Sequence, residues 1–205
     1  MIVRIHSKGQ PRTKPSEERR ADLMDAAVKL FVEKGVAPTT VEQITEGARV
    51  AKGTFYLHFN SKEDVLAALR ERFVRGLLQG IEKAVAERPA DDSSGKLEAW
   101  AQASIEGYFG ALALHDVVFH EFKAHSREEH SDNVLIAHLG TLLDGGTAAG
   151  AWHVEDSRFT AVFLFHGFHG IIEDALVKEK RVNRQRLAKK LTAQFFQAVG
   201  LRLTP

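Results

Sequence analysis

Four polar side chains on one short predicted helix have the chemistry to bind DNA. Lys52, Thr54, Tyr56 and His58 occupy alternate positions in the segment VAKGTFYLHFN. Their ammonium, hydroxyl and imidazole groups can donate hydrogen bonds to phosphate oxygens and to acceptor atoms on base edges. Taken singly, each residue is equally consistent with an ordinary exposed helix face. The DNA-binding interpretation therefore depends on the elements that hold this helix.

Histidine offers a second kind of chemistry, since the chain contains ten of them. His166, His169 and Glu173 follow a spacing of three and then four residues along a predicted helix, so they share one face. Imidazole and carboxylate groups are metal ligands, and the alternative hypothesis is therefore a helical metal- or haem-dependent sensor or enzyme. Hydrogen bonding in a core or a pocket is the favoured interpretation. We predict no catalytic residue, no metal and no cofactor.

The elements around the candidate DNA-binding helix follow from local signals. A first helix is predicted to begin near Ser16 and to end at Gly35, because glycine commonly terminates helices. Thr40 suits the N-cap of a second, short helix, and Gln43 completes a capping box three residues later. The candidate helix follows over residues 52–58. Two short helices joined by a tight turn are typical of a helix-turn-helix motif.

Apolar periodicity predicts helices through the rest of the chain, so the fold class is all-α with about nine helices. Ser61, with Asp64 as its capping partner, begins a long helix. Later helices are predicted over about 96–114, 117–125, 126–143 (opened by a Ser126–Glu129 capping box), 157–178 and 184–199.

The last two predicted helices carry many apolar residues, and one chain of this size offers little to cover them. We therefore expect a homodimer interface there, with a monomeric helical core as the alternative. The interface residues predicted are Phe163, Phe168, Ile172, Leu187, Leu191 and Phe195.

Composition and charge fit this interpretation. The chain has 205 residues, of which 44% are hydrophobic and none is cysteine, so it can bury a core and forms no disulfide. Residues 1–75 hold 14 Lys/Arg against 10 Asp/Glu, whereas the remainder holds 14 against 17. A basic N-terminal part is typical of nucleic-acid binding, although a solvated charged tail explains it equally well. No apolar run predicts a signal peptide or a membrane span, and we expect a cytoplasmic protein without a membrane partner.

Residues 20–66 resemble the DNA-binding region of the tetracycline-repressor (TetR) family of bacterial transcriptional regulators. The segments that carry the resemblance are ADLMDAAVKLFVEKG, TTVEQIT and VAKGTFYLHFNSKEDVL, together with their spacing. The resemblance implies DNA contacts from Thr40, Arg49, Lys52, Gly53, Thr54, Tyr56, His58 and Lys62.

Two positions depart from the family pattern. Arg49 stands where the family usually has a turn glycine, which costs about 1 kcal/mol if the backbone there is left-handed. Ala51 stands where Ser or Thr usually caps the recognition helix, and the missing cap is worth about 1 kcal/mol. Both departures bear on the local geometry and on the base preference.

The resemblance also implies an organisation for the whole chain. It comprises a basic flexible arm over residues 1–15, a three-helix DNA-binding domain over 16–62, and a larger helical domain over 63–205 that binds an effector and dimerises. The basic side chains expected to be mobile and to attract phosphates are Arg12, Lys14, Arg19 and Arg20.

The function implied is that of a non-enzymatic repressor, released from a palindromic double-stranded DNA operator by a small, largely apolar effector. The effector-pocket residues expected are Trp100, Tyr108, Phe109, His138 and His166, because they place aromatic faces and hydrogen-bonding groups on the central helices.

Overall fold

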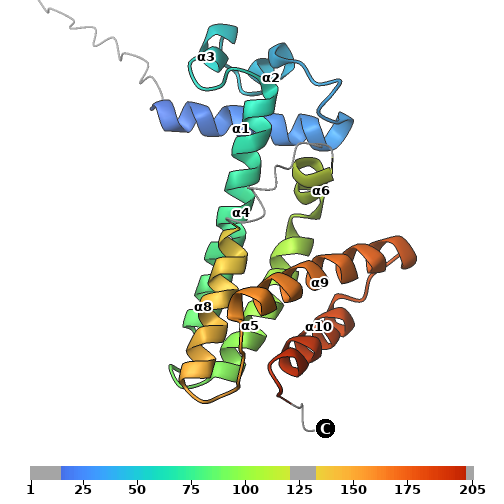
Figure 1. Cartoon of the computed structure of the whole chain (residues 1–205). Coiled ribbons are helices and arrows are strands. Elements are labelled where there is room, and N and C mark those ends of the chain that lie inside the picture. Colours follow the sequence, from blue (N-terminus) through green and yellow to red (C-terminus); the bar gives the residue numbers. More distant parts are fainter. Residues whose placement is uncertain (1–14, 121–132, 202–205) are drawn as a thin grey trace, which may run out of the picture. The chain divides into compact units, whose positions relative to one another are not determined.

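The computed structural model describes residues 15–120 and 133–201, and within these ranges the chain is helical and contains no strand. The described helices are α1 (Ser16–Lys34), α2 (Val41–Gly47), α3 (Lys52–Tyr56), α4 (Lys62–Ala86), α5 (Ser93–Gly110), α6 (Leu112–His120), α8 (Val134–Ala148), α9 (Ser157–Lys178) and α10 (Arg184–Ala198) (Figure 1). The all-α prediction is confirmed. The chain divides into two compact units, Met1–Leu69 and Arg70–Pro205. The boundary falls within α4.

The first unit is a small helical body whose ends are set by local signals. α1 begins at Ser16 and ends before Gly35, which has a left-handed backbone with φ 85°. Thr40 and Gln43 form the predicted capping box, in which each side chain accepts a hydrogen bond from the other residue's backbone N–H, at 3.3 and 3.2 Å. The start of α2 is therefore held on both sides.

The beginning of α4 is capped by a wider arrangement than the predicted one. The backbone N–H of Asp64 donates to Ser61 Oγ at 3.1 Å, as expected of an N-cap. The Asp64 carboxylate reaches one residue further back, where it accepts hydrogen bonds from the backbone N–H and the side-chain amide of Asn60. These bonds lower the pKa of the Asp64 carboxyl.

The second unit is a larger helical body in which α5 occupies a central place. α5 packs against both α8 and α10, and α9 packs against α8 and α10 (Figure 1). The predicted continuous helix over 96–114 is wrong, because the chain bends at Ala111 and separates α5 from α6. Asn133 caps α8 through Leu135 N–H at 2.9 Å. The predicted capping residues Ser126 and Glu129 lie outside the described residues.

The second unit has a large apolar core, and this core takes most of the predicted dimer residues. Phe168 and Ile172 on α9 and Leu187, Leu191 and Phe195 on α10 are all buried within one chain. Packing against α5 and α8 supplies the cover that the sequence did not reveal. These five side chains are consequently not available to a second copy in this conformation.

Helix α9 is, by length and composition alone, long and apolar enough to cross a membrane. This finding does not contradict the expected absence of a membrane span, because the core helix of a globular protein has the same length and composition. Helix α9 contributes Ala161, Leu164 and Phe168 to the core of the second unit and packs against its neighbours. This is how a core helix of a globular domain behaves.

Candidate functional site

The candidate recognition helix α3 is anchored by one buried ring. Phe55 is fully buried, and its ring contacts Tyr56 edge-on at 5.4 Å and Phe59 at 5.8 Å. Ala51, just before the helix, makes no side-chain cap, as predicted. The orientation of this short helix therefore depends on Phe55 packing.

The residues on the outer side of α3 are open to solvent. Lys52, Gly53 and Tyr56 are exposed, whereas Thr54 and His58 are half-buried. A Cβ atom added at Gly53 would meet no protein atom within 4 Å. Packing within the protein thus does not require glycine at this position. A close approach by a partner such as DNA does give a reason for it.

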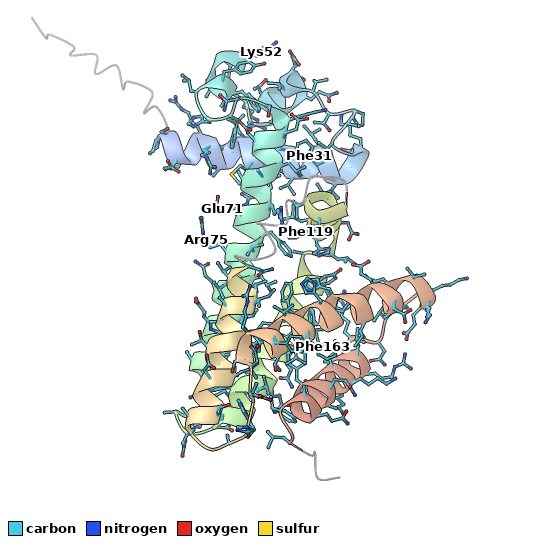
Figure 2. All side chains as sticks on the ribbon, viewed as in Figure 1. Phe31, Lys52, Glu71, Arg75, Phe119 and Phe163 are labelled. Carbon is cyan, nitrogen blue, oxygen red and sulfur yellow. The ribbon has the colours of Figure 1, made fainter. Side chains whose placement is uncertain are left out.

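Lys52 is held by a carboxylate that the sequence analysis did not single out. The Nζ atom of Lys52, which is labelled in Figure 2, lies 2.5 Å from Glu42 Oε1. The ion pair therefore joins the beginnings of α2 and α3. The hydrogen bond from Lys52 lowers the pKa of the Glu42 carboxyl, and the same bond raises the pKa of the Lys52 ammonium. The two residues lie on different helices, and no local spacing signal connects them.

The turn between α2 and α3 contains an arginine with a backbone conformation that glycine adopts without strain. Arg49 has φ 56°, which makes it the one non-glycine residue with a left-handed backbone in the described part of the chain. Its side chain is exposed. The backbone costs about 1 kcal/mol for an L-residue. A cation is therefore kept at a position where glycine would be more stable.

Lys62, for which the resemblance implies a DNA contact, forms hydrogen bonds within the first unit. Its ammonium donates to three carbonyl oxygens in the segment between α1 and α2, those of Val36 (2.8 Å), Ala37 (2.8 Å) and Thr39 (3.2 Å). An ammonium has three N–H donors, so these bonds use all of them. Lys62 therefore ties α4 to the preceding connection within the first unit.

Two of the four basic residues predicted to be mobile belong to a helix. Arg19 and Arg20 lie in α1, and the Arg20 guanidinium sits over the Phe59 ring at 5.0 Å and contacts Met24 Sδ. Arg12 and Lys14 lie outside the described residues. Within residues 15–69, Arg20 thus serves packing.

The predicted effector residues do not form a single group. Trp100 Nε1 donates to His138 Nδ1 at 3.2 Å in one part of the second unit. Phe109 instead lies under the Arg184 guanidinium, 5.0 Å from its ring centre. His166 is exposed on α9. The sequence pattern predicted which polar and aromatic residues lie on the central helices, but not which of these side chains contact one another.

A polar and aromatic cluster does form around Tyr108. Its hydroxyl donates to Glu173 Oε1 at 2.5 Å, and its ring lies 4.2 Å from His115 and 5.8 Å from His169. Burial first, and then the hydrogen bond with Glu173, raises the pKa of the Tyr108 phenol. Two further rings, Phe73 on α4 and Phe119 on α6, complete this Tyr108 cluster. His115 was not predicted for it, because the bend at Ala111 sets its direction.

The metal hypothesis for His166, His169 and Glu173 gains no support from their geometry. His169 Nδ1 donates to the Phe165 carbonyl at 2.9 Å, which fixes the proton on that nitrogen. Burial is the main cause that lowers the pKa of His169. Glu173 accepts from Tyr108, while His166 is exposed. Among residues 15–120 and 133–201, no three His, Asp or Glu side chains are grouped so as to hold a metal ion.

Comparison with known proteins identifies the helix-turn-helix region. Residues 23–69 match the family described as "Bacterial regulatory proteins, tetR family". The chain is 33% identical over 95 residues to the HTH-type transcriptional activator FasR of Mycolicibacterium smegmatis. The aligned segment covers 46% of this chain and 41% of that protein. The chain is 36% identical over 88 residues to the HTH-type transcriptional repressor KstR2 of Rhodococcus jostii, with 43% and 42% covered. The chain thus spans less than half the length of these relatives.

The fold is shared over a much greater length. A solved SmeT–triclosan complex superimposes with a TM-score of 0.69 and 21% identity, covering 88% of this chain and 91% of that one. At this identity the likeness concerns the fold alone. It extends beyond the helix-turn-helix region into the second unit.

Proposed function

We propose that the chain, whose residues 23–69 match the tetR family of bacterial regulatory proteins, is a cytoplasmic transcriptional repressor of that family that binds a palindromic DNA operator. The family is one of non-enzymatic DNA-binding regulators. The observation that carries the proposal is the exposed face of α3, where Lys52, Gly53 and Tyr56 are open to solvent above the buried Phe55. An ammonium and a phenol on a rigidly anchored short helix suit base edges and phosphates of the major groove.

Dimerisation supplies the second reading helix. An exposed apolar stripe on α9 supports it. Phe159 and Phe163 are 70% and 66% exposed, and the exposed residues Ile171 and Val177 continue the stripe along the helix. Phe163 is labelled in Figure 2. Large apolar side chains that line up on one helix mark an interaction surface. Glycines 167 and 170 lie between them, and a Cβ atom added at either meets nothing within 4 Å. We therefore propose that this stripe packs against α9 of a second copy, in place of the buried residues predicted from the sequence.

The effector site we propose is the Tyr108 cluster. It combines apolar rings with three hydrogen-bonding side chains, those of Tyr108, His169 and Glu173, which suits a small and largely apolar molecule with one polar group. The solved SmeT structure contains such a small molecule, triclosan, and this supports effector binding here.

Helix α4 runs from the first unit into the second, where it contributes Phe73 to the Tyr108 cluster. Its Phe73 ring lies 5.8 Å from both His115 and Phe119. The same helix begins at Lys62, whose ammonium holds the segment between α1 and α2. A ligand that displaces Phe73 would therefore shift α4 and lower operator affinity. By linkage, operator DNA then lowers effector affinity by the same factor.

The test begins with selection of operator sequences from a random duplex library. We expect a near-palindrome whose half-sites are separated by about one helical turn, roughly 34–36 Å, or a multiple of it. Transcription from a promoter that carries the selected operator should fall when the protein is added. Failure to enrich any sequence would refute the DNA-binding proposal. Increased transcription would refute only the repressor assignment.

A further inference from the structure

We propose that Glu42 is a specificity-determining residue, which holds Lys52 for operator contact and weakens binding to other DNA. This inference rests on the proposed function, because it concerns how a DNA-binding protein separates its operator from random sequence. It begins from the Glu42–Lys52 ion pair, which joins two helices of the first unit.

The ion pair lies in the open, where it would face DNA. The Lys52 and Glu42 side chains are 56% and 61% exposed. Lys52 is the one cation within α2 and α3, whose sequences are VEQITEG and KGTFY. Any approach of α3 to a duplex therefore brings the Glu42 carboxylate close to phosphates as well.

Local structure holds the backbone of both partners of the ion pair. Glu42 lies in the first turn of α2, directly beside the capping box that Thr40 and Gln43 form. Lys52 begins α3, which Phe55 anchors. Only the two side chains remain adjustable. The Glu42 carboxylate accordingly restricts where the Lys52 ammonium can lie.

Random DNA and operator DNA differ in the hydrogen-bond acceptors that a lysine paired with a carboxylate can reach. Binding to random sequence comes mainly from neutralised phosphates, and a lysine already paired with a carboxylate contributes less to it. A guanine in the major groove presents two acceptors, O6 and N7. An ammonium has three donors, so Lys52 can contact a guanine and keep Glu42 at the same time. The Glu42 carboxylate thus weakens binding that depends only on phosphate contacts more than binding that includes a base contact.

The experiment compares wild type with Glu42→Gln on two DNA duplexes of equal length, the selected operator and a random sequence. Affinity is measured by fluorescence anisotropy over a range of salt concentrations. We expect Glu42→Gln to bind the random duplex about two- to fivefold more tightly, the effect typical of one exposed charge pair. Its log–log salt slope on random DNA should steepen by up to about 0.9, the value for one phosphate contact. Operator affinity should not increase, so the ratio between the two affinities falls.

Glu46→Gln is the matched control, since it removes the same charge from the same helix one turn further along. It should change the two affinities by equal factors. In a Lys52→Met background, Glu42→Gln should no longer change the ratio. This second comparison shows whether Glu42 acts through Lys52.

Two results would overturn the inference. One is equal tightening of both duplexes by Glu42→Gln, as in the control, which would mean a general charge effect. The other is equal weakening of both together with a lower melting temperature, which would mean a purely structural role. A wild-type protein that binds operator and random duplex alike would instead refute the proposed function, and the inference with it.

Discussion

Tyr108 and Glu173, 65 residues apart in the sequence, are joined by a hydrogen bond of 2.5 Å from the phenol to Oε1. The bond links α5 to α9 inside the second unit. Burial and the neighbouring carboxylate raise the pKa of the Tyr108 phenol, so it remains a donor at neutral pH. The contact therefore joins two packed helices by a polar bond within a largely apolar core.

Replacing Tyr108 with phenylalanine should destabilise the second unit. The substitution removes the donor while keeping the ring, and a hydrogen bond to a charged group contributes about 1.5–3 kcal/mol. We expect a decrease of this order in the free energy of unfolding, measured by urea denaturation. Tyr56→Phe is the control, because Tyr56 is exposed on α3 and should change stability by less than about 0.5 kcal/mol. Equal unfolding midpoints for wild type and Tyr108→Phe would show that the bond does not stabilise the fold.

Stability should fall in acid partly because of His169. Burial lowers its pKa below the ordinary value of 6.5, so the unfolded chain takes up a proton at a higher pH than the folded protein does. The stabilising effect of the neutral ring is therefore present above pH 6.5 and is lost as the pH falls through the folded-state pKa. His169→Gln should lose less stability than wild type between about pH 7.5 and pH 5. His153→Gln, at an exposed loop residue, should follow wild type, and parallel curves for all three proteins would refute the assignment.

Lys62→Met should destabilise the first unit. The substitution leaves three carbonyl oxygens, those of Val36, Ala37 and Thr39, without the ammonium that they share. Because the site is partly open to water, we expect a loss of about 1–2 kcal/mol in the free energy of unfolding. Lys29→Met is the control, at an exposed position of α1. If Lys62→Met instead weakened operator binding with no loss of stability, the DNA contact implied by the resemblance would be the better assignment.

Local signals in the sequence were sufficient for the ends of the first helices. Gly35 ends α1, and the Thr40–Gln43 box opens α2, because such caps involve residues only a few positions apart. The resemblance drew attention to Arg49, which stands at a usual glycine position, and its backbone is left-handed. None of these features depends on distant parts of the chain.

Features that need tertiary contacts were beyond the sequence. Glu42 and Lys52 lie on different helices, and the same is true of Tyr108 and Glu173. The bend at Ala111 interrupts a helical period that continues on both sides, so periodicity alone could not place it. Leu191 seemed free for a partner because the sequence does not show that α5 packs against α10.

Arg49→Gly should stabilise the fold and weaken DNA binding. Glycine accepts a φ of 56° without strain, so we expect the free energy of unfolding to rise by up to about 1 kcal/mol. The substitution also removes an exposed cation, and the log–log salt slope of operator binding should fall by about 0.9 if one phosphate contact is lost. Ala48→Gly is the control for added chain flexibility, because Ala48 has an ordinary right-handed backbone and should only lose stability. An unchanged salt slope would remove Arg49 from the proposed DNA contacts.

Phe163→Glu and Leu191→Glu distinguish the exposed stripe of α9 from the core beneath it. Phe163 is 66% exposed, so a carboxylate there meets water in a single chain but meets the partner's apolar surface in the proposed dimer. We expect a folded monomer, detected by light scattering and circular dichroism, with much weaker operator binding because one reading helix is lost. Leu191 is only 1% exposed, so its replacement should unfold the second unit. Val32→Glu, at an exposed position of α1, is the control that should leave assembly unchanged. A Phe163→Glu protein that is still dimeric would exclude this stripe as the interface, and a folded monomer that binds operator as tightly as wild type would refute the need for two reading helices.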